Sequence, residues 1–208
     1  MNHELTEYVR RKYDRYALVY DLMEFPMEKL TLGKWREQIW RMAKGRILEV
    51  GVGTGKNIPH HPRGCPVVGV DFSRKMLERA VRRAQQTRSP VELLWADVQE
   101  LPFPDNSFDT VVATCVFCSV PDPVRGFQEL RRVCKDDGKL LFLEHMRSER
   151  PIVGKLMDAL NPLIRGLVGV NINRRTLENI RAAGLVIEQV TDLQSDIVRL
   201  IVARPGKG

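Results

Sequence analysis

The 208-residue sequence lacks the long hydrophobic run of a membrane-spanning helix, because no stretch of about 18 apolar residues occurs in it. Its first residues, MNHELTEYVRRK, lack the apolar core of a secretory signal peptide. Only four cysteines are present, and their spacing is too irregular for the disulfide framework of a small secreted protein. We therefore expect reduced thiols and a cytoplasmic protein.

The cysteines also lack the pattern of a metal site. Cys115 and Cys118 form a C-x-x-C pair, but neither Cys65 nor Cys134 belongs to a second such pair. A structural zinc ion needs two further ligands at suitable spacing. We therefore predict that the protein binds no metal.

Acidic residues are in the minority, and the formal net charge is +7. The basic excess is concentrated in residues 146–181, which hold seven basic and three acidic side chains. Such a segment is either an ordinary solvated surface or a contact for an anionic partner, such as a membrane surface or nucleic acid. The hydrophobic fraction of 43% suits one globular domain with a helical appendage.

The sequence is organised around residues 46–57, RILEVGVGTGKN. A short apolar run that meets alternate glycines indicates a buried strand followed by a tight turn, in which backbone can approach a ligand closely. Asn57 could then cap a helix whose N–H groups face that ligand. The spacing matches neither a P-loop nor the dinucleotide fingerprint G-x-G-x-x-G.

Strand-like and helix-like segments alternate from residue 46 onward. This alternation predicts an α/β fold with a doubly wound parallel sheet, and the last two strands are predicted to be antiparallel to each other. Predicted strands are residues 46–50, 66–70, 91–95, 110–113, 140–143, 185–190 and 197–203, and predicted helices are residues 27–42, 74–86 (capped by Ser73), 123–133 and 174–183.

Polar and acidic residues follow successive predicted strands. Asp71 follows the second strand and could accept hydrogen bonds from a ribose diol, while Asp97 follows the third and could accept from an exocyclic amine. Val98 could cover an adenine face, and Thr114 with Cys115 follows the fourth strand. Because ligands bind beyond the carboxyl ends of such strands, these residues are predicted to meet in one site.

At this point the chain resembles the class I S-adenosylmethionine (SAM)-dependent methyltransferases. The resemblance rests on residues 48–57, 67–80, 96–123 and 129–145, including the segment LPFPDNSFD, and is strongest to the ubiquinone/menaquinone-biosynthesis methyltransferases and the bacterial phospholipid N-methyltransferases. It implies a Rossmann-like seven-stranded sheet with its last strand antiparallel, N-terminal helices and a helical lid. It implies SAM as cofactor, with the methionine end at Glu49, Gly51, Gly53 and Gly55, the ribose and adenine at Asp71, Phe72, Asp97 and Val98, and further contacts at Thr114 and Cys115.

Candidate catalytic residues are fewer. His145 is either a base that faces the transferred methyl group or a structural histidine, and Glu144 is either a ligand for a substrate ammonium or a buried, paired carboxylate. Tyr20 is the last of four tyrosines that share a helical stripe with Tyr8, Tyr13 and Tyr16. That stripe lies either on a membrane surface, over the site, or against the core.

The accessory segments are predicted to select the acceptor. Residues 1–43 are predicted to form an N-terminal helical lid, and residues 44–208 the methyltransferase domain with an insertion at 146–173. Within the insertion, residues 151–170 are apolar with scattered basic side chains, which suits an interfacial helix or a helix pair buried on the domain. Residues 171–175, NINRR, could bind phosphate, and Asn173 could cap the next helix.

The favoured function is methyl transfer to the nitrogen of phosphatidylethanolamine by a cytoplasmic protein that is peripheral on the inner membrane face. Alternatives are C-methylation of a prenylated quinone precursor and S- or N-methylation of a small apolar molecule. A SAM-binding module without catalysis and an RNA methyltransferase are further alternatives. We expect no nucleic-acid partner, because TCVF stands where many nucleic-acid methyltransferases carry an N-P-P-Y-type tetrapeptide.

Overall fold

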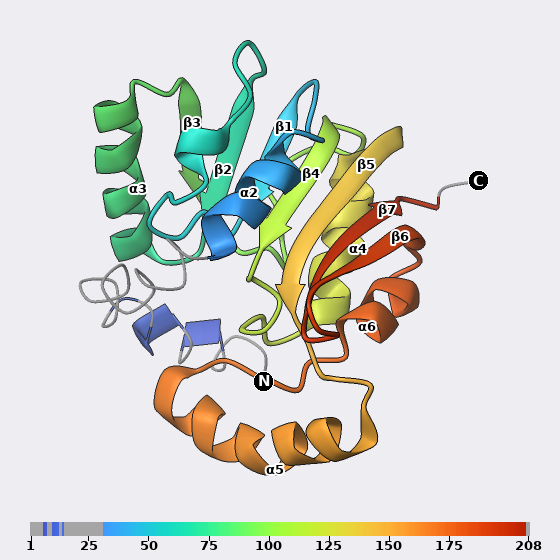
Figure 1. The fold of residues 1–208 in the computed structure, drawn as a ribbon. Helices are drawn as coiled ribbons and strands as arrows, with labels where there is room; N and C mark the ends of the chain where they lie inside the picture. The colour runs from blue at the N-terminus through green and yellow to red at the C-terminus, as the bar shows by residue number, and fades with distance from the viewer. Residues whose placement is uncertain (1–5, 8–9, 13, 15–30, 207–208) are drawn as a thin grey trace.

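The computed structural model describes residues 6–7, 10–12, 14 and 31–206, and its centre is a seven-stranded sheet. The strand order is β3-β2-β1-β4-β5-β7-β6. Figure 1 shows this sheet with helices on both of its faces. The strands are β1 (Ile47–Val50), β2 (Val67–Asp71), β3 (Val91–Trp95), β4 (Phe108–Thr114), β5 (Cys134–His145), β6 (Val186–Gln194) and β7 (Val198–Arg204).

Strands β1 to β5 pair in parallel, and β7 pairs antiparallel with both β5 and β6. The predicted Rossmann-like sheet with an antiparallel last strand is therefore confirmed. The strand order reverses between β1 and β4, which lie side by side. The carboxyl ends of these two strands form the switch point at which open α/β sheets bind ligands.

Helices cover the sheet because its central strands are apolar on both faces. Ile47 packs with Ile39 and Trp40 of α2 on one face, whereas Leu48 and Val50 pack with α4 on the other. The helices are α2 (Gly33–Trp40), α3 (Arg74–Thr87), α4 (Pro123–Val133), α5 (Pro151–Val168) and α6 (Thr176–Ala182), with a short 3-10 helix η2 (Ile58–His60).

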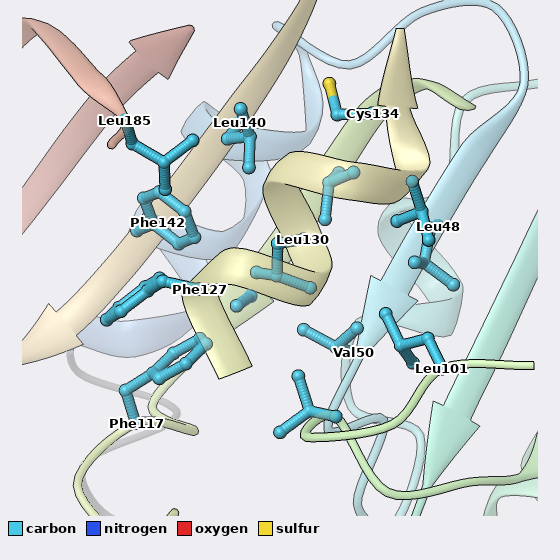
Figure 2. Close-up of a cluster of buried hydrophobic side chains, with 14 of the residues drawn as sticks. Leu48, Val50, Leu101, Phe117, Phe127, Leu130, Cys134, Leu140, Phe142 and Leu185 are labelled. Atoms are coloured by element: carbon cyan, nitrogen blue, oxygen red, sulfur yellow. The ribbon is translucent and has the colours of Figure 1, made fainter. Parts of the chain in front are cut away.

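The larger core cluster lies between the sheet and α4, as Figure 2 shows. Phe117 stacks on Phe127 with ring centroids 3.6 Å apart, and Phe142 meets both rings edge-on. Such aromatic contacts add to the free energy gained from burial. They fix the loop after β4, which carries Phe117, to the body of the domain.

Several predicted boundaries differ from those of the structure. β5 begins at Cys134 rather than residue 140, because backbone pairing with β4 extends into a polar segment that shows no strand-like pattern. Asn57 precedes only η2 and makes no side-chain cap. Asn173 does not cap α6, whose N-cap is Arg175, and its amide instead donates to Asp158. Both asparagines bind other side chains in preference to the helix end.

Helix α5 is one continuous helix rather than a buried pair. In Figure 1 it lies across the end of the molecule to which β4 and β5 point. Arg147 holds it through a double hydrogen bond to Asp158, and Lys12 donates to the carbonyl oxygens of Arg165 and Gly166 in its last turn. No helix within the described residues is long and apolar enough to cross a membrane.

Candidate functional site

A pocket opens at the carboxyl ends of β1 to β4 and brings most of the predicted cofactor residues together. The lining includes eight of them, namely Gly51, Gly53, Asp71, Phe72, Asp97, Val98, Thr114 and Cys115. Glu49 and Gly55 do not line it. The pocket lining also includes residues that were not among the predicted site residues, such as Arg36, Lys56 and Gln99.

The backbone of the turn after β1 favours glycine at two positions. Gly51 and Gly53 have φ values of +66° and +57°, a region that L side chains rarely adopt. A Cβ on Gly51 would lie 2.4 Å from Cγ2 of Val116. A Cβ on Gly53 would meet no atom closer than the Gly51 carbonyl oxygen at 4.0 Å, so this residue leaves open space beside the pocket. The turn therefore fits a ligand that approaches the backbone closely.

Asp71 joins the end of β2 to this turn. Its Oδ2 accepts a hydrogen bond from the N–H of Gly53 at 2.8 Å, and its Oδ1 accepts from the N–H of Ser73 at 2.8 Å. Burial raises the pKa of this carboxyl to about 6, although the two backbone donors oppose the shift. Each oxygen keeps a further lone pair, so a ribose diol can donate to the same carboxylate.

Asp97 is oriented by its neighbour Gln99. The backbone N–H of Gln99 donates to Asp97 Oδ1 at 2.9 Å, and the Gln99 amide donates to both carboxylate oxygens. Oε1 of Gln99 accepts from the N–H of Asp122, which ties the end of β3 to the start of α4. No pattern in the sequence distinguishes this buried glutamine from the other glutamines of the chain.

Arg36 of α2 also lines the pocket. Its Nη1 donates to Asn57 Oδ1 at 2.8 Å and to Thr114 Oγ1 at 2.9 Å. This buried guanidinium is a candidate ligand for the carboxylate of a bound amino acid group, because arginine binds carboxylates through paired N–H donors. Its position on a helix that precedes the first strand gave no signal in the sequence.

Glu49 lies below the turn, where both of its oxygens are occupied. Oε1 accepts from Asn57 Nδ2 at 2.6 Å, and Oε2 lies 2.8 Å from His61 Nε2. Gly55 packs against Ile58 and Ala80 instead of lining the pocket. These two residues therefore support the shape of the site, and their contact with the cofactor stays a prediction.

The predicted catalytic residues of β5 also lie outside the pocket lining. Glu144 is fully buried, and its Oε1 accepts from the N–H groups of Val116 at 2.9 Å and Phe117 at 3.3 Å. Burial raises the pKa of Glu144 to about 7. Burial likewise lowers the pKa of His145. Glu144 thus holds the backbone of the loop after β4. Of the two roles predicted for it, this geometry matches the buried carboxylate and not the ligand of a substrate ammonium.

The thiols show no sign of metal binding. Cys118 is buried, and burial raises the pKa of its thiol well above the ordinary value, which keeps it protonated. Cys115 lines the pocket with a left-handed φ of +57°. Among the residues that the structure describes, no cluster of His, Cys, Asp or Glu could hold a metal ion.

The N-terminal segment reaches the pocket through the few residues of it that are described. Thr6 lines the pocket, and Asp14 accepts a hydrogen bond from the Ser73 hydroxyl at 2.6 Å. Tyr20 and the rest of the tyrosine stripe lie outside the described residues.

Helix α5 presents an exposed apolar surface. The surface, called the α5 stripe below, repeats at intervals of three or four residues, as one face of a helix does. Its side chains are between 43% and 84% exposed. They are Ile152, Leu156, Leu160, Leu163 and Leu167.

Comparison with known proteins agrees with this geometry. Residues 48–142 match the family model described as a methyltransferase domain. The chain is 37% identical over 156 residues to a phosphatidylethanolamine N-methyltransferase from Cereibacter sphaeroides, covering 73% of this chain and 75% of the relative. It is 31% identical over 222 residues to a demethylmenaquinone methyltransferase from Clavibacter sepedonicus, covering 92% and 88%.

Solved methyltransferase structures share the fold. A solved structure of geranyl diphosphate methyltransferase in complex with SAM superposes with a TM-score of 0.69 at 20% identity, covering 83% of each chain. The glycine turn, the ribose-compatible carboxylate of Asp71 and the sheet order fit SAM as the cofactor. The chain belongs to the class I SAM-dependent methyltransferases.

Proposed function

We propose that this enzyme methylates the amino group of phosphatidylethanolamine, or a closely similar lipid amine, at an anionic membrane surface. The α5 stripe is the observation that carries the proposal, because exposed leucines on one helix face are stable where lipid covers them. The phosphatidylethanolamine N-methyltransferase among the relatives supports the choice of acceptor.

The charges around the α5 stripe suit anionic lipid. Lys155 and Arg165 are exposed on the same helix, and the acidic Asp158 is paired with Arg147. Juxtamembrane lysine and arginine each contribute about 1 kcal/mol of attraction to an anionic surface. An apolar face with basic neighbours can therefore rest at the level of the lipid headgroups, on the side of the molecule where the pocket opens.

The residues of the pocket act by binding and positioning. SAM supplies an electrophilic methyl group on a sulfonium, to which the lone pair of the acceptor bonds as the carbon–sulfur bond breaks. Asp71 and Asp97 would hold the ribose and adenine, and Arg36 the methionine carboxylate. Glu144 keeps the loop at Val116 in place. The lid predicted for residues 1–43 would exclude water, so that positioning supplies the rate enhancement.

The second candidate is C-methylation of a prenylated quinone precursor, which the demethylmenaquinone methyltransferase relative favours. That reaction needs a base for the ring hydroxyl. No histidine lines the pocket among the described residues, and its two carboxylates, Asp71 and Asp97, are the proposed ligands of the ribose and adenine. A lipid amine can lose its proton to solvent before it enters, so the amine acceptor remains favoured over the quinone and over a small apolar S- or N-acceptor.

The test is methyl transfer from labelled SAM to defined vesicles. Phosphatidylglycerol vesicles that contain phosphatidylethanolamine should become labelled, and the product should carry the mass of an N-methylated headgroup. Phosphatidylglycerol vesicles with a demethylated prenylquinone in place of phosphatidylethanolamine should not. An Asp71→Ala variant serves as the inactive control. Label in the quinone, or none in phosphatidylethanolamine, contradicts the proposal.

A further inference from the structure

A second, smaller pocket adjoins the cofactor pocket at the end of α5. Ser119, Val120 and Pro121 line both pockets, so one short segment separates them. The remaining walls come from Arg165, from Gly169 at the end of the helix, and from Asn171 and Arg174 beyond it. The cavity is about 90 Å³, which leaves room for a phosphate group.

The charged residues that line this pocket are all basic. Two guanidinium groups line it and no carboxylate does. Within the described part of the chain, neither Arg165 nor Arg174 forms an ion pair with an acid, whereas Arg147 and Arg175 are both paired. Burial lowers the pKa of Arg174 most and the charge of Arg165 lowers it further, while Cys118 and the nearby buried Glu144 oppose the shift. Two like charges in a small cavity repel each other, and an anion that binds between them offsets this repulsion.

Arg174 is held in place by backbone acceptors, so its remaining donors are preorganised. Its Nη2 donates to the carbonyl oxygen of Val120 at 2.8 Å and of Cys118 at 3.4 Å. Its Nε is buried and has no hydrogen-bond partner in the described structure. The amide of Asn171 also donates to Cys118 at 3.0 Å, which fixes the wall opposite α5. A buried donor without a partner is costly, and an oxyanion would satisfy it.

We propose that this pocket is a phosphate subsite, and that in catalysis it holds the phosphodiester of the acceptor lipid. Arg165 and Arg174 supply the donors, as arginines do in most sites that recognise phosphate in a fixed orientation. In phosphatidylethanolamine only two carbons separate the phosphate oxygen from the amine. A phosphate in this pocket therefore keeps the amine at the neighbouring cofactor pocket, while the α5 stripe faces the acyl chains. The assignment to a lipid rests on the proposed function; the anion site does not.

The first test measures binding without turnover. The full-length protein with S-adenosylhomocysteine is titrated with glycerophosphoethanolamine, and separately with inorganic phosphate, by calorimetry. Arg165→Gln should weaken binding of glycerophosphoethanolamine about tenfold, and Arg165→Lys should restore part of it. Arg181→Gln, which removes the same charge from the exposed face of α6, should bind like the wild type. Equal binding by the wild type and Arg165→Gln overturns the subsite.

The second test separates the two possible sources of phosphate. Glycerophosphoethanolamine should bind more tightly than inorganic phosphate, and the reverse order overturns the lipid assignment. With a short-chain phosphatidylethanolamine as substrate, Arg165→Gln should raise KM about tenfold and leave kcat nearly unchanged. If the enzyme methylates a quinone and Arg165 still binds phosphate, the proposed function fails and the anion site stands. If it methylates phosphatidylethanolamine and Arg165→Gln changes neither binding nor KM, only the subsite fails.

Discussion

The carboxylate of Asp71 and the backbone N–H of Gly53 meet at 2.8 Å, and this hydrogen bond ties the second strand to the turn that follows the first. The two residues are 18 positions apart in the sequence. Because Asp71 holds the turn and also faces the pocket, one side chain serves both the shape of the site and the binding of the ribose.

Asp71→Asn should therefore weaken SAM binding without unfolding the domain. The amide keeps an acceptor for one backbone N–H but replaces the other acceptor with a donor, so we expect a loss of about 2 kcal/mol, or about thirtyfold in Kd. Calorimetric titration with SAM measures it. Asp192→Asn on the surface of β6 is the matched control, and equal affinity in the two variants would show that Asp71 is not a ligand.

Arg36→Gln should weaken binding of SAM more than binding of adenosine. The guanidinium lies at the glycine turn beside Asn57 and Thr114, where only the amino-acid end of the cofactor carries a carboxylate. Loss of a hydrogen bond to a charged group should reduce the binding free energy of SAM by about 1.5–3 kcal/mol, which raises Kd at least tenfold. Arg41→Gln, on the exposed end of the same region, should change neither affinity. An equal loss for both ligands would argue for a general effect on folding.

Glu144 should make the stability of the fold depend on pH. Its folded pKa of about 7 lies above the ordinary value of 4.5, so the folded state keeps a proton that the unfolded chain has lost. This contribution is fully present below about pH 4.5 and is lost as the pH rises through about 7, with a magnitude on the order of 3 kcal/mol.

The Glu144→Gln variant tests this dependence directly. The glutamine can still accept from Val116 but does not titrate, so the wild type should lose stability relative to the variant between about pH 5 and about pH 8. Urea unfolding at several pH values gives the difference. A constant difference across this range would mean that Glu144 is ionised in the folded protein.

The α5 stripe should govern partition onto anionic vesicles. Leu156→Ser together with Leu163→Ser removes two large exposed side chains, each of which contributes about 1–2 kcal/mol when lipid covers it. We expect at least tenfold weaker retention in vesicle flotation and an unchanged melting temperature. Val81→Ser, which alters an exposed apolar residue of α3, is the control. Undiminished flotation of the double variant would assign membrane contact elsewhere.

Cofactor should protect one thiol. Cys115 lines the pocket and is partly exposed, whereas Cys118 is buried with a raised pKa. Iodoacetamide should therefore modify Cys115 before Cys118, and saturating SAM should slow the reaction of Cys115 but not of the distant, partly exposed Cys65. Peptide mass spectrometry after timed quenching measures the rates. Equal rates at Cys115 with and without SAM would place the cofactor away from it.

The sequence alone determined the fold class and, through the family resemblance, the cofactor, because these depend on local signals. Residues 46–98 contain alternate glycines after the first predicted strand and an acidic residue after each of the next two predicted strands. Each of these motifs is local, because it lies at the end of a single strand. The parallel sheet then brings the strand ends together with no further information.

Only the tertiary structure decided which of these residues face the pocket and which support it. Glu144 follows a predicted strand as Asp71 does, and both accept from backbone N–H groups, but only Asp71 lines the pocket. Glu49 lies within β1, where Asn57 and His61 occupy its oxygens. Arg36 and the arginine pair at the end of α5 reach their sites across long sequence separations, whereas Gln99 is fixed by its contact with Asp122. The α5 leucines are apolar whether buried or exposed, so only packing could show that they are exposed in the described structure.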